Sequence, residues 1–268
     1  EQIDNYPGFE DGIDGFTLGE KMQQSAERFG AVTELAEVYK VSLSGRIKTL
    51  DTSEGVFQSR TVVIATGASP RPLGIPGEDT LTGKGVHYCA ACDGAPYRGK
   101  TVAVVGGGNV SMDATRTALR LGAESVTCVY RRRVEDMTAL AEEIEEAMAE
   151  GCQILPLQAP SRIEADENGC VTALWTRPQH IGPYGNDGRP KPVAADAPQF
   201  RIPCDYVIVA IGQAIAAKPF EAVGVTTQRG AIQADLSSAG PGLDNVFAGG
   251  DAVSGPATVI RAVAAGKV

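Results

Sequence analysis

A glycine-rich turn between an apolar run and an amphipathic segment constrains the fold of this chain most. Four apolar residues at 102–105 precede three consecutive glycines at 106–108. A helical pattern over residues 109–121 and a second apolar run at 125–130 follow. This order of strand, tight turn, helix and strand predicts a βαβ unit of a parallel sheet. The chain is therefore expected to contain an α/β domain that binds a dinucleotide.

Each residue of the turn has a physical reason for its size. Gly106 permits the tight turn, and Gly108 lets a pyrophosphate approach the backbone at the start of the helix. Ser111 stands where a third glycine is usual, and its small side chain still permits close packing of helix on strand. A purely structural glycine turn is the alternative. The predicted binding residues of the turn are Gly106, Gly107, Gly108, Asn109, Val110 and Ser111.

The end of the second strand indicates which dinucleotide binds. A site for NADH needs an acidic residue there for the ribose hydroxyls, but three arginines occupy residues 131–133. A guanidinium pairs with a phosphate through two parallel hydrogen bonds. Arg131 and Arg132 are therefore predicted to hold the 2′-phosphate of NADPH, with a solvated basic patch as the alternative.

Cys89 and Cys92 form the only closely spaced cysteine pair, and Asp93 follows them. Such a pair suits thiol–disulfide exchange, in which one thiolate attacks and the second resolves. A structural zinc ion needs four ligands, and only His87 lies nearby, so no metal site is predicted. Inert thiols remain the other alternative. The other four cysteines are predicted to be small buried residues.

Composition limits the partners and the location. The chain has 268 residues, 43% of them hydrophobic, and a net charge of −9. An acidic protein repels nucleic acids and anionic membranes, so neither is a predicted partner. The sequence has no apolar run of about 18 residues and no signal-peptide pattern at its start, which predicts a cytoplasmic protein.

Two candidate linkers divide the chain. One is the Pro/Gly-rich stretch 69–77, and the other is residues 212–218. They predict one domain, residues 72–211, inserted into another made of residues 1–71 and 212–268. Within the inserted domain, the proline-rich residues 178–198 are predicted to form an extended surface loop.

Several motifs together resemble a known family. Residues 5–8, 63–68, 89–94 and 246–251, taken with the glycine turn, look like bacterial thioredoxin reductase, an FAD- and NADPH-dependent pyridine nucleotide–disulfide oxidoreductase. A second resemblance overlaps the first. Residues 130–151, the loop at 185–192, residues 208–213 and residues 255–260 look like the small subunit of glutamate synthase.

The first resemblance implies an α/β fold with two Rossmann-like, three-layer domains, the NADPH domain being inserted in an incomplete FAD domain. It also implies that electrons pass from NADPH to FAD, then to the Cys89/Cys92 pair with Asp93 as the acid, and finally to a thioredoxin-like or other protein disulfide. A homodimer is implied for the complete protein. The second resemblance implies an alternative, an electron-relay subunit that passes electrons from NADPH through flavin to an iron–sulfur partner. A third possibility is an NADPH-binding module without turnover.

The reductase resemblance adds cofactor-binding residues and exposes two departures. The residues implied for the cofactors, besides those above, are Asn5, Thr66, Gly67, Ile211, Gly250, Asp251, Thr258 and Val259. The family has a further arginine where this chain has Asp136, and Arg133 is the candidate substitute. The family also begins with another glycine-rich βαβ unit that holds FAD. This chain starts after that unit, so we expect it to be a fragment of a longer protein.

Overall fold

The computed structural model describes residues 2–3, 6–185, 188–228, 230–235 and 238–267. The chain forms two compact units: unit 1 is Glu1–Leu18 with Pro70–Gly212, and unit 2 is Gly19–Ser69 with Gln213–Val268. The predicted inserted domain, residues 72–211, differs from the long segment of unit 1 by two residues at one end and one at the other. Residues 1–18 group with unit 1 rather than with the rest of the predicted FAD domain. The assignment of each cofactor to a domain stays a prediction.

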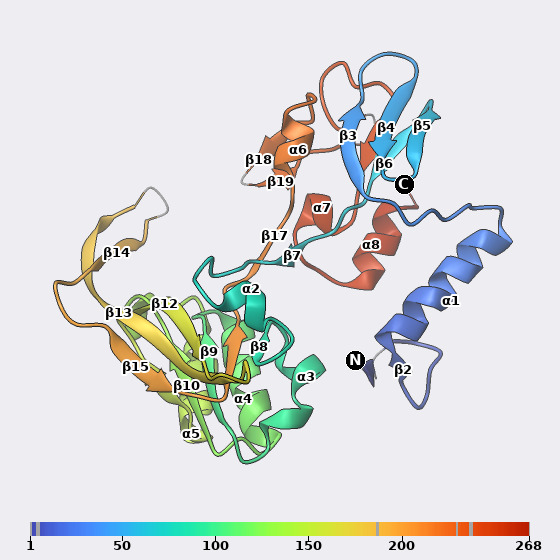
Figure 1. Cartoon of the computed structure of the whole chain (residues 1–268). Coiled ribbons are helices and arrows are strands. Elements are labelled where there is room, and N and C mark those ends of the chain that lie inside the picture. The colour runs from blue at the N-terminus through green and yellow to red at the C-terminus, as the bar shows by residue number, and fades with distance from the viewer. Residues whose placement is uncertain (1, 4–5, 186–187, 229, 236–237, 268) are drawn as a thin grey trace. The chain divides into compact units, whose positions relative to one another are not determined.

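Unit 1 is built on a five-stranded sheet in which all neighbouring strands are parallel (Figure 1). The strand order is β11-β10-β9-β16-β8. Its strands are β8 (Val86–His87), β9 (Thr101–Val105), β10 (Ser125–Val129), β11 (Gln153–Leu155) and β16 (Tyr206–Val209). Valine is frequent in these strands because a β-branched side chain packs well on a pleated, buried surface.

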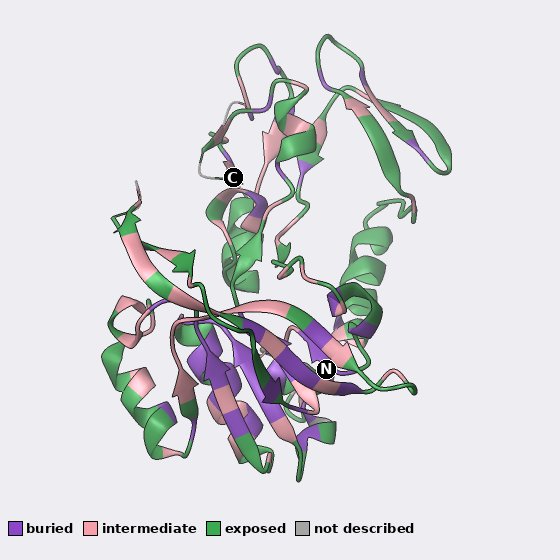
Figure 2. Ribbon diagram, turned by 60° about the vertical axis from the view of Figure 1, so that its left-hand side comes forward, coloured by how far each residue is buried: buried purple, intermediate pink, exposed green. Residues whose placement is uncertain are grey.

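Each face of this sheet is covered by a different layer. Val102 and Val104 of β9 pack with Ala114 and Ala118 of helix α4, whereas Ala103 and Val105 point to the other face. Figure 2 shows the resulting buried centre of the unit. The helical layer contains α4 (Asn109–Arg120) and α5 (Ala141–Ala149). The opposite layer is an antiparallel sheet of β12 (Gln158–Ala165), β13 (Val171–Tyr184), β14 (Pro190–Ala194) and β15 (Phe200–Pro203). Unit 1 is therefore a three-layer α/β domain.

The extended loop predicted for residues 178–198 is wrong. Strand β13 continues to Tyr184 and pairs antiparallel with β14, with Gln179 opposite Ala194 and Ile181 opposite Pro192. Prolines lack a backbone N–H and are tolerated on an edge strand, which is the place of β14 in this sheet. The proline content that suggested a loop therefore marks an edge.

Unit 2 contains an antiparallel meander and a short parallel pair. Strands β3 (Val38–Ser42), β4 (Lys48–Thr52) and β5 (Gly55–Ser59) are antiparallel, and β6 (Val62–Ile64) pairs in parallel with β20 (Val246–Ala248). Leu43, Ile64 and Val246 belong to its core. Its other elements are most of α1 (Gly15–Arg28), α6 (Lys218–Glu221), α7 (Asp251–Ser254), α8 (Val259–Ala265), β18 (Thr227–Gln228) and β19 (Ala231–Ile232).

The remaining short elements are β1 (Gln2–Ile3), β2 (Ile13–Asp14), β7 (Ser69–Pro70), α2 (Glu78–Leu81), α3 (Ala90–Asp93), β17 (Gln213–Ala214) and the 3-10 helices Ala95–Tyr97 and Val134–Asp136. Strands β7 and β17 lie in the two predicted linkers and pair with each other. In the described part of the chain, no helix combines the length and the apolar character needed to cross a bilayer.

A buried carboxylate fixes the first linker. Glu78 is fully buried, and it accepts hydrogen bonds from the backbone N–H groups of Leu73 and Gly74, both at 2.7 Å. The hydroxyl of Tyr88 donates to the same carboxylate at 2.8 Å. Burial, together with this hydrogen bond, raises the pKa of Tyr88 to about 12, so its hydroxyl stays a proton donor at neutral pH.

We expect Glu78→Gln to lower the free energy of unfolding by about 2 to 4 kcal/mol, because the amide nitrogen places a donor where a buried donor needs an acceptor. Asp79→Asn is the matched control, since Asp79 lies in the same helix but is exposed. The urea midpoints of the two variants measure the difference. Equal midpoints would show that the buried carboxylate does not hold the linker.

Candidate functional site

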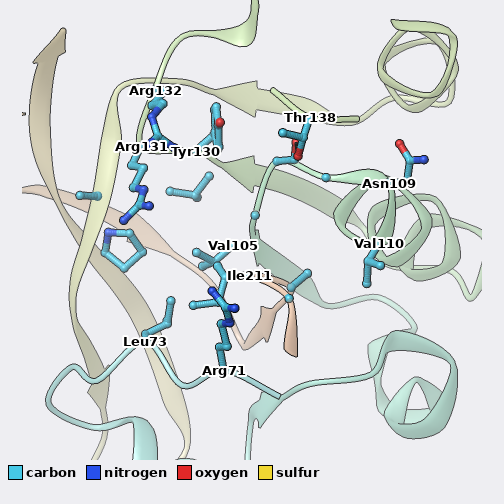
Figure 3. A pocket seen from close by; sticks show the side chains of 18 of the residues that line it. Arg71, Leu73, Val105, Asn109, Val110, Tyr130, Arg131, Arg132, Thr138 and Ile211 are labelled. Atoms are coloured by element: carbon cyan, nitrogen blue, oxygen red, sulfur yellow. Dashed lines mark hydrogen bonds between the residues drawn. The ribbon is translucent and has the colours of Figure 1, made fainter. Parts of the chain in front are cut away.

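A cavity of about 650 Å³ opens in unit 1 at the carboxyl ends of β9 and β16 (Figure 3). The chain runs from β9 outward through β10 and β11 on one side, whereas β16 lies on the other side of β9. Ligands of open α/β sheets bind at such a reversal of strand order. The lining includes the predicted Gly106, Gly107, Gly108, Asn109, Val110, Arg131, Arg132 and Ile211.

Two glycines of the turn have neighbours so close that no side chain fits. A Cβ atom on Gly106 would overlap the backbone carbonyl oxygen of Ala210 and lie 2.8 Å from Cβ of Ser111. A Cβ atom on Gly107 would lie 2.9 Å from Cζ of Tyr130. At Gly108 the nearest atom is the Thr138 hydroxyl at 3.4 Å, so this position is open on the cavity side. The first N–H groups of an α-helix have no helical partner, which suits the first turn of α4 to a phosphate.

A loop after β10 holds the turn in place. The N–H groups of Thr138 and Ala139 donate to the carbonyl oxygen of Gly107, at 2.8 and 3.1 Å. The N–H of Leu140 donates to Oδ1 of Asn109 at 2.9 Å. Ser111 is fully buried, and its hydroxyl donates to the carbonyl oxygen of Gly108 at 2.6 Å. Ser111 and the side-chain amide of Asn109 therefore stabilise the conformation of the turn.

Four arginines line the cavity. Arg131 and Arg132 come from the end of β10, as predicted, and sequence reasoning missed Arg71 and Arg189. Figure 3 shows Arg71 and Arg131 extending toward each other from different segments. Four arginines in the lining of one cavity of an acidic chain favour an anionic ligand such as a phosphate. No sequence pattern pointed to Arg71 or Arg189, because each lies far along the chain from the glycine turn.

Arg133 has a different partner from the one the sequence suggested. Its Nε and Nη2 atoms donate to the two carboxylate oxygens of Asp136, at 2.8 and 3.0 Å. The guanidinium of Arg133 lowers the pKa of Asp136, so the acid stays ionised. Asp136, at the position of the family's further arginine, therefore engages Arg133 instead of leaving it to substitute for that arginine.

The predicted redox pair lies at the start of α3. Cys89 is disulfide-bonded, and the side chain of Cys92 lies outside the described part of the structure, so the pairing of the two stays a prediction. Gly94 follows α3, and a Cβ atom there would overlap Leu121 after α4, so the segment packs against α4. Asp93 is exposed beside it.

His87 is a hydrogen-bonded residue of the core. Its Nδ1 atom lies 2.8 Å from the Tyr97 hydroxyl, and its ring packs against Tyr97 and Tyr206. Burial lowers the pKa of His87, and the Asp93 carboxylate opposes that shift. At neutral pH the imidazole is therefore neutral.

The cysteines outside the pair differ from one another. Cys128, Cys152 and Cys204 are buried, as predicted, and burial raises the pKa of each thiol. Cys170 is exposed, which corrects the prediction that all four are buried. It lies in the turn between β12 and β13, where its N–H donates to Oδ1 of Asp166 at 2.9 Å. Among the described residues, no three His, Cys, Asp or Glu side chains gather into a metal site.

Unit 2 has a cavity of about 600 Å³ that gathers most of the residues predicted for FAD. Asp251 accepts a hydrogen bond from the N–H of Ala257 at 3.2 Å, which ties α7 to the segment before α8. Thr66 is exposed next to Gly67, and Asn5 lies outside the described residues. The predicted residues in the cavity lining are Gly67, Gly250, Asp251, Thr258 and Val259.

Comparison with known proteins decides the family. Residues 3–266 match the model of the pyridine nucleotide-disulphide oxidoreductases. The chain belongs to this family. It is 32% identical over 256 residues to the thioredoxin reductase of Bacillus subtilis, which covers 94% of this chain and 73% of that protein. It is also 40% identical over 214 residues to the NADP(+)-dependent formate dehydrogenase subunit beta of Moorella thermoacetica, covering 77% of this chain and 30% of that protein.

Solved structures agree on the fold. The thioredoxin reductase of Lactococcus lactis superposes with a TM-score of 0.71 at 24% identity, over 99% of this chain and 81% of that one. The predicted α/β fold class, the resemblance to thioredoxin reductase and the class of pyridine nucleotide oxidoreductase are confirmed, and the predicted cofactors NADPH and FAD agree with the family. Other curated thioredoxin reductases match over a shorter stretch, 132 residues, which is 41% of the length of the Streptomyces coelicolor protein.

Proposed function

We propose that this protein is an NADPH-dependent flavoprotein that reduces a protein disulfide through Cys89 and Cys92. The observation that carries the proposal is the disulfide-bonded Cys89, which directly precedes a helix, α3, that contacts α4, the helix after the glycine turn. When bound, NADPH would supply a hydride, and FAD would relay its two electrons to the Cys89/Cys92 disulfide. In total, NADPH and one proton convert one disulfide into two thiols and leave NADP+.

The residues of both cavities fit these cofactors. In unit 1, the glycine turn admits a pyrophosphate, and the arginines match a 2′-phosphate. In unit 2, Gly67 and Gly250 let a ligand approach the backbone, while Asp251 offers a carboxylate for a hydroxyl of the ribitol chain. Asp93, exposed beside the cysteine segment, is proposed to exchange a proton with the thiol that leaves the mixed disulfide.

The proposed substrate is a thioredoxin-like protein disulfide, and the complete protein is proposed to be a cytoplasmic homodimer. The names of the relatives support the substrate: several are thioredoxin reductases, and one from Mycobacterium leprae is a bifunctional thioredoxin reductase/thioredoxin. A reducing compartment suits a cysteine pair that must be regenerated by NADPH.

Replacement of Cys92 by serine in the full-length, FAD-loaded protein tests the proposal. NADPH-dependent reduction of thioredoxin is expected to fall by at least about a hundredfold, because a single thiol cannot cycle between dithiol and disulfide. Cys170→Ser is the matched control, since Cys170 is an exposed cysteine outside both cavities. A Cys92→Ser variant that reduces thioredoxin at the normal rate would refute the disulfide mechanism.

The match to a formate dehydrogenase subunit favours a second candidate, an electron relay from NADPH through flavin to an iron–sulfur partner. In that case an iron–sulfur subunit co-purifies with the protein, and the Cys92→Ser variant passes electrons from NADPH to that subunit at the normal rate. Loss of electron transfer to the iron–sulfur subunit in the Cys92→Ser variant would exclude this candidate.

A further inference from the structure

The hairpin of β13 and β14 is not part of the βαβ unit, yet it reaches the nucleotide cavity. Arg189, directly before β14, lies in the lining of that cavity with Arg131 and Arg132. These residues are separated by more than fifty positions in the sequence. The hairpin therefore adds a positive charge that the glycine turn and its two strands do not supply.

Hydrogen bonds connect the hairpin with residues 130–136, and each of the two segments contributes a donor. Nη2 of Arg189 donates to the hydroxyl of Tyr130 at 2.7 Å and to the carbonyl oxygen of Asp136 at 2.6 Å. In return, Nε of Arg132 donates to the carbonyl oxygen of Pro190 at 2.7 Å. The Tyr130 hydroxyl also donates to the backbone carbonyl oxygen of Asp136, at 2.8 Å. Hydrogen bonds that fix a guanidinium in one place reduce the entropy it loses when it binds a phosphate.

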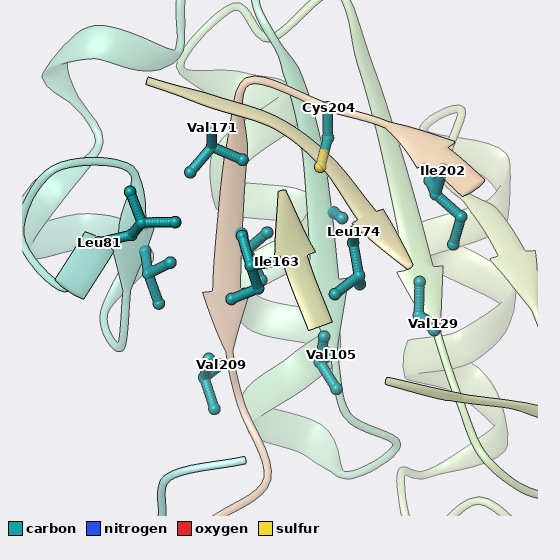
Figure 4. Packing of buried hydrophobic residues seen from close by; sticks show 12 residues of the cluster. Leu81, Val105, Val129, Ile163, Val171, Leu174, Ile202, Cys204 and Val209 are labelled. Atoms are coloured by element: carbon teal, nitrogen blue, oxygen red, sulfur yellow. The ribbon is translucent and has the colours of Figure 1, made fainter. Parts of the chain in front are cut away.

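The base of the hairpin is anchored to the same sheet that carries the turn. Leu174 of β13 packs in one core with Val105 and Val129, which end the strands β9 and β10 (Figure 4). In β12, next to β13, Ala159 and Pro160 line the cavity. Because this core is shared, the position of Arg189 is tied to that of the glycine turn.

We propose that Arg189 is a specificity residue for the 2′-phosphate of NADPH, supplied by the β13–β14 hairpin. The inference rests on the proposed use of NADPH. Tyr130, which Arg189 contacts, directly follows β10, and the residues at the end of this strand read the ribose 2′-position in such βαβ units. A guanidinium held at that place by the Tyr130 hydroxyl meets the phosphate together with Arg131 and Arg132.

The test compares two probes that differ only by the 2′-phosphate, adenosine 2′,5′-bisphosphate and adenosine 5′-monophosphate. Their dissociation constants are measured by calorimetry for the intact protein and its variants. Arg189→Ala is expected to weaken binding of the bisphosphate about 10- to 100-fold and to change binding of the monophosphate less than about twofold. Tyr130→Phe, which keeps the ring against Gly107, is expected to weaken binding of the bisphosphate by a smaller factor than Arg189→Ala. Arg177→Ala removes an exposed arginine of β13 outside the cavity lining and is expected to change neither.

The outcomes separate this inference from the proposed function. Unchanged bisphosphate binding in Arg189→Ala overturns the inference, and so does an equal loss for both probes, which indicates a purely structural role. The monophosphate thus also reports whether the variant folds. Equal affinity of the unaltered protein for both probes refutes the use of NADPH itself, whereas a preference for the bisphosphate that survives Arg189→Ala refutes only the role of Arg189.

Discussion

Replacement of Arg131 by alanine is expected to weaken NADPH binding by about 10- to 100-fold while the affinity for NADH stays within about twofold. Arg131 lies in the cavity lining at the carboxyl end of β10, where a 2′-phosphate would be bound. A hydrogen-bonded charge pair of this kind contributes about 1.5 to 3 kcal/mol, which corresponds to this range of affinity. NADH lacks the 2′-phosphate and therefore loses nothing.

Arg133→Ala is the matched control for this prediction. The two arginines are separated by one residue, but the guanidinium of Arg133 is held by both carboxylate oxygens of Asp136. We expect its replacement to change NADPH affinity less than about threefold. Fluorescence titration with each dinucleotide measures all four values. A larger loss in Arg133→Ala than in Arg131→Ala would contradict the assignment of the phosphate site.

Gly106→Ala is expected to lower the free energy of unfolding by about 2 to 3 kcal/mol and to abolish tight NADPH binding. The added Cβ overlaps a backbone carbonyl of Ala210 and crowds the buried Ser111, and neither neighbour is the end of a flexible side chain. Relief of this overlap requires the turn to move away from β16 or from α4, which costs packing energy and displaces the phosphate site.

Gly108→Ala separates the two effects. This position has an extended backbone with φ of −108°, and its nearest neighbour would be the Thr138 hydroxyl at 3.4 Å, so a methyl group fits the protein but protrudes into the cavity. We expect normal stability with weaker NADPH binding. Gly19 lies in α1 with open space around the position of a Cβ atom. Gly19→Ala is therefore expected not to lower the free energy of unfolding and not to weaken NADPH binding. Thermal unfolding and titration of the three variants check the ranking, and a Gly106→Ala protein as stable as the parent would contradict it.

Local patterns in the sequence were sufficient to predict the βαβ unit. The apolar strands, the glycine turn and the helix over 109–121 agree with one another, and the structure has β9, α4 and β10 at these positions. Hydrophobic periodicity and glycine placement are local properties, so they can be read without knowledge of the tertiary structure.

The parts that the sequence did not predict depend on contacts between distant segments. The proline-rich residues 178–198 lacked a strand pattern, because their strand character depends on pairing with β13 at a sheet edge. Arg189 reaches the cavity only through that pairing, and Arg71 only through the linker that Glu78 fixes. The sequence showed Asp136 as a departure from the family pattern. Its pairing with Arg133 could not be predicted, because it depends on the conformation of the loop.

An NADPH site in the cavity at the glycine turn requires the unaltered protein to distinguish NADPH from NADH. Calorimetric titration of the unaltered protein with NADPH and with NADH tests this requirement most directly. We predict one NADPH per chain and at least about tenfold weaker binding of NADH, because the arginines at the end of β10 have no 2′-phosphate to bind in NADH. Equal affinities, or tighter binding of NADH, would contradict the assignment of an NADPH site.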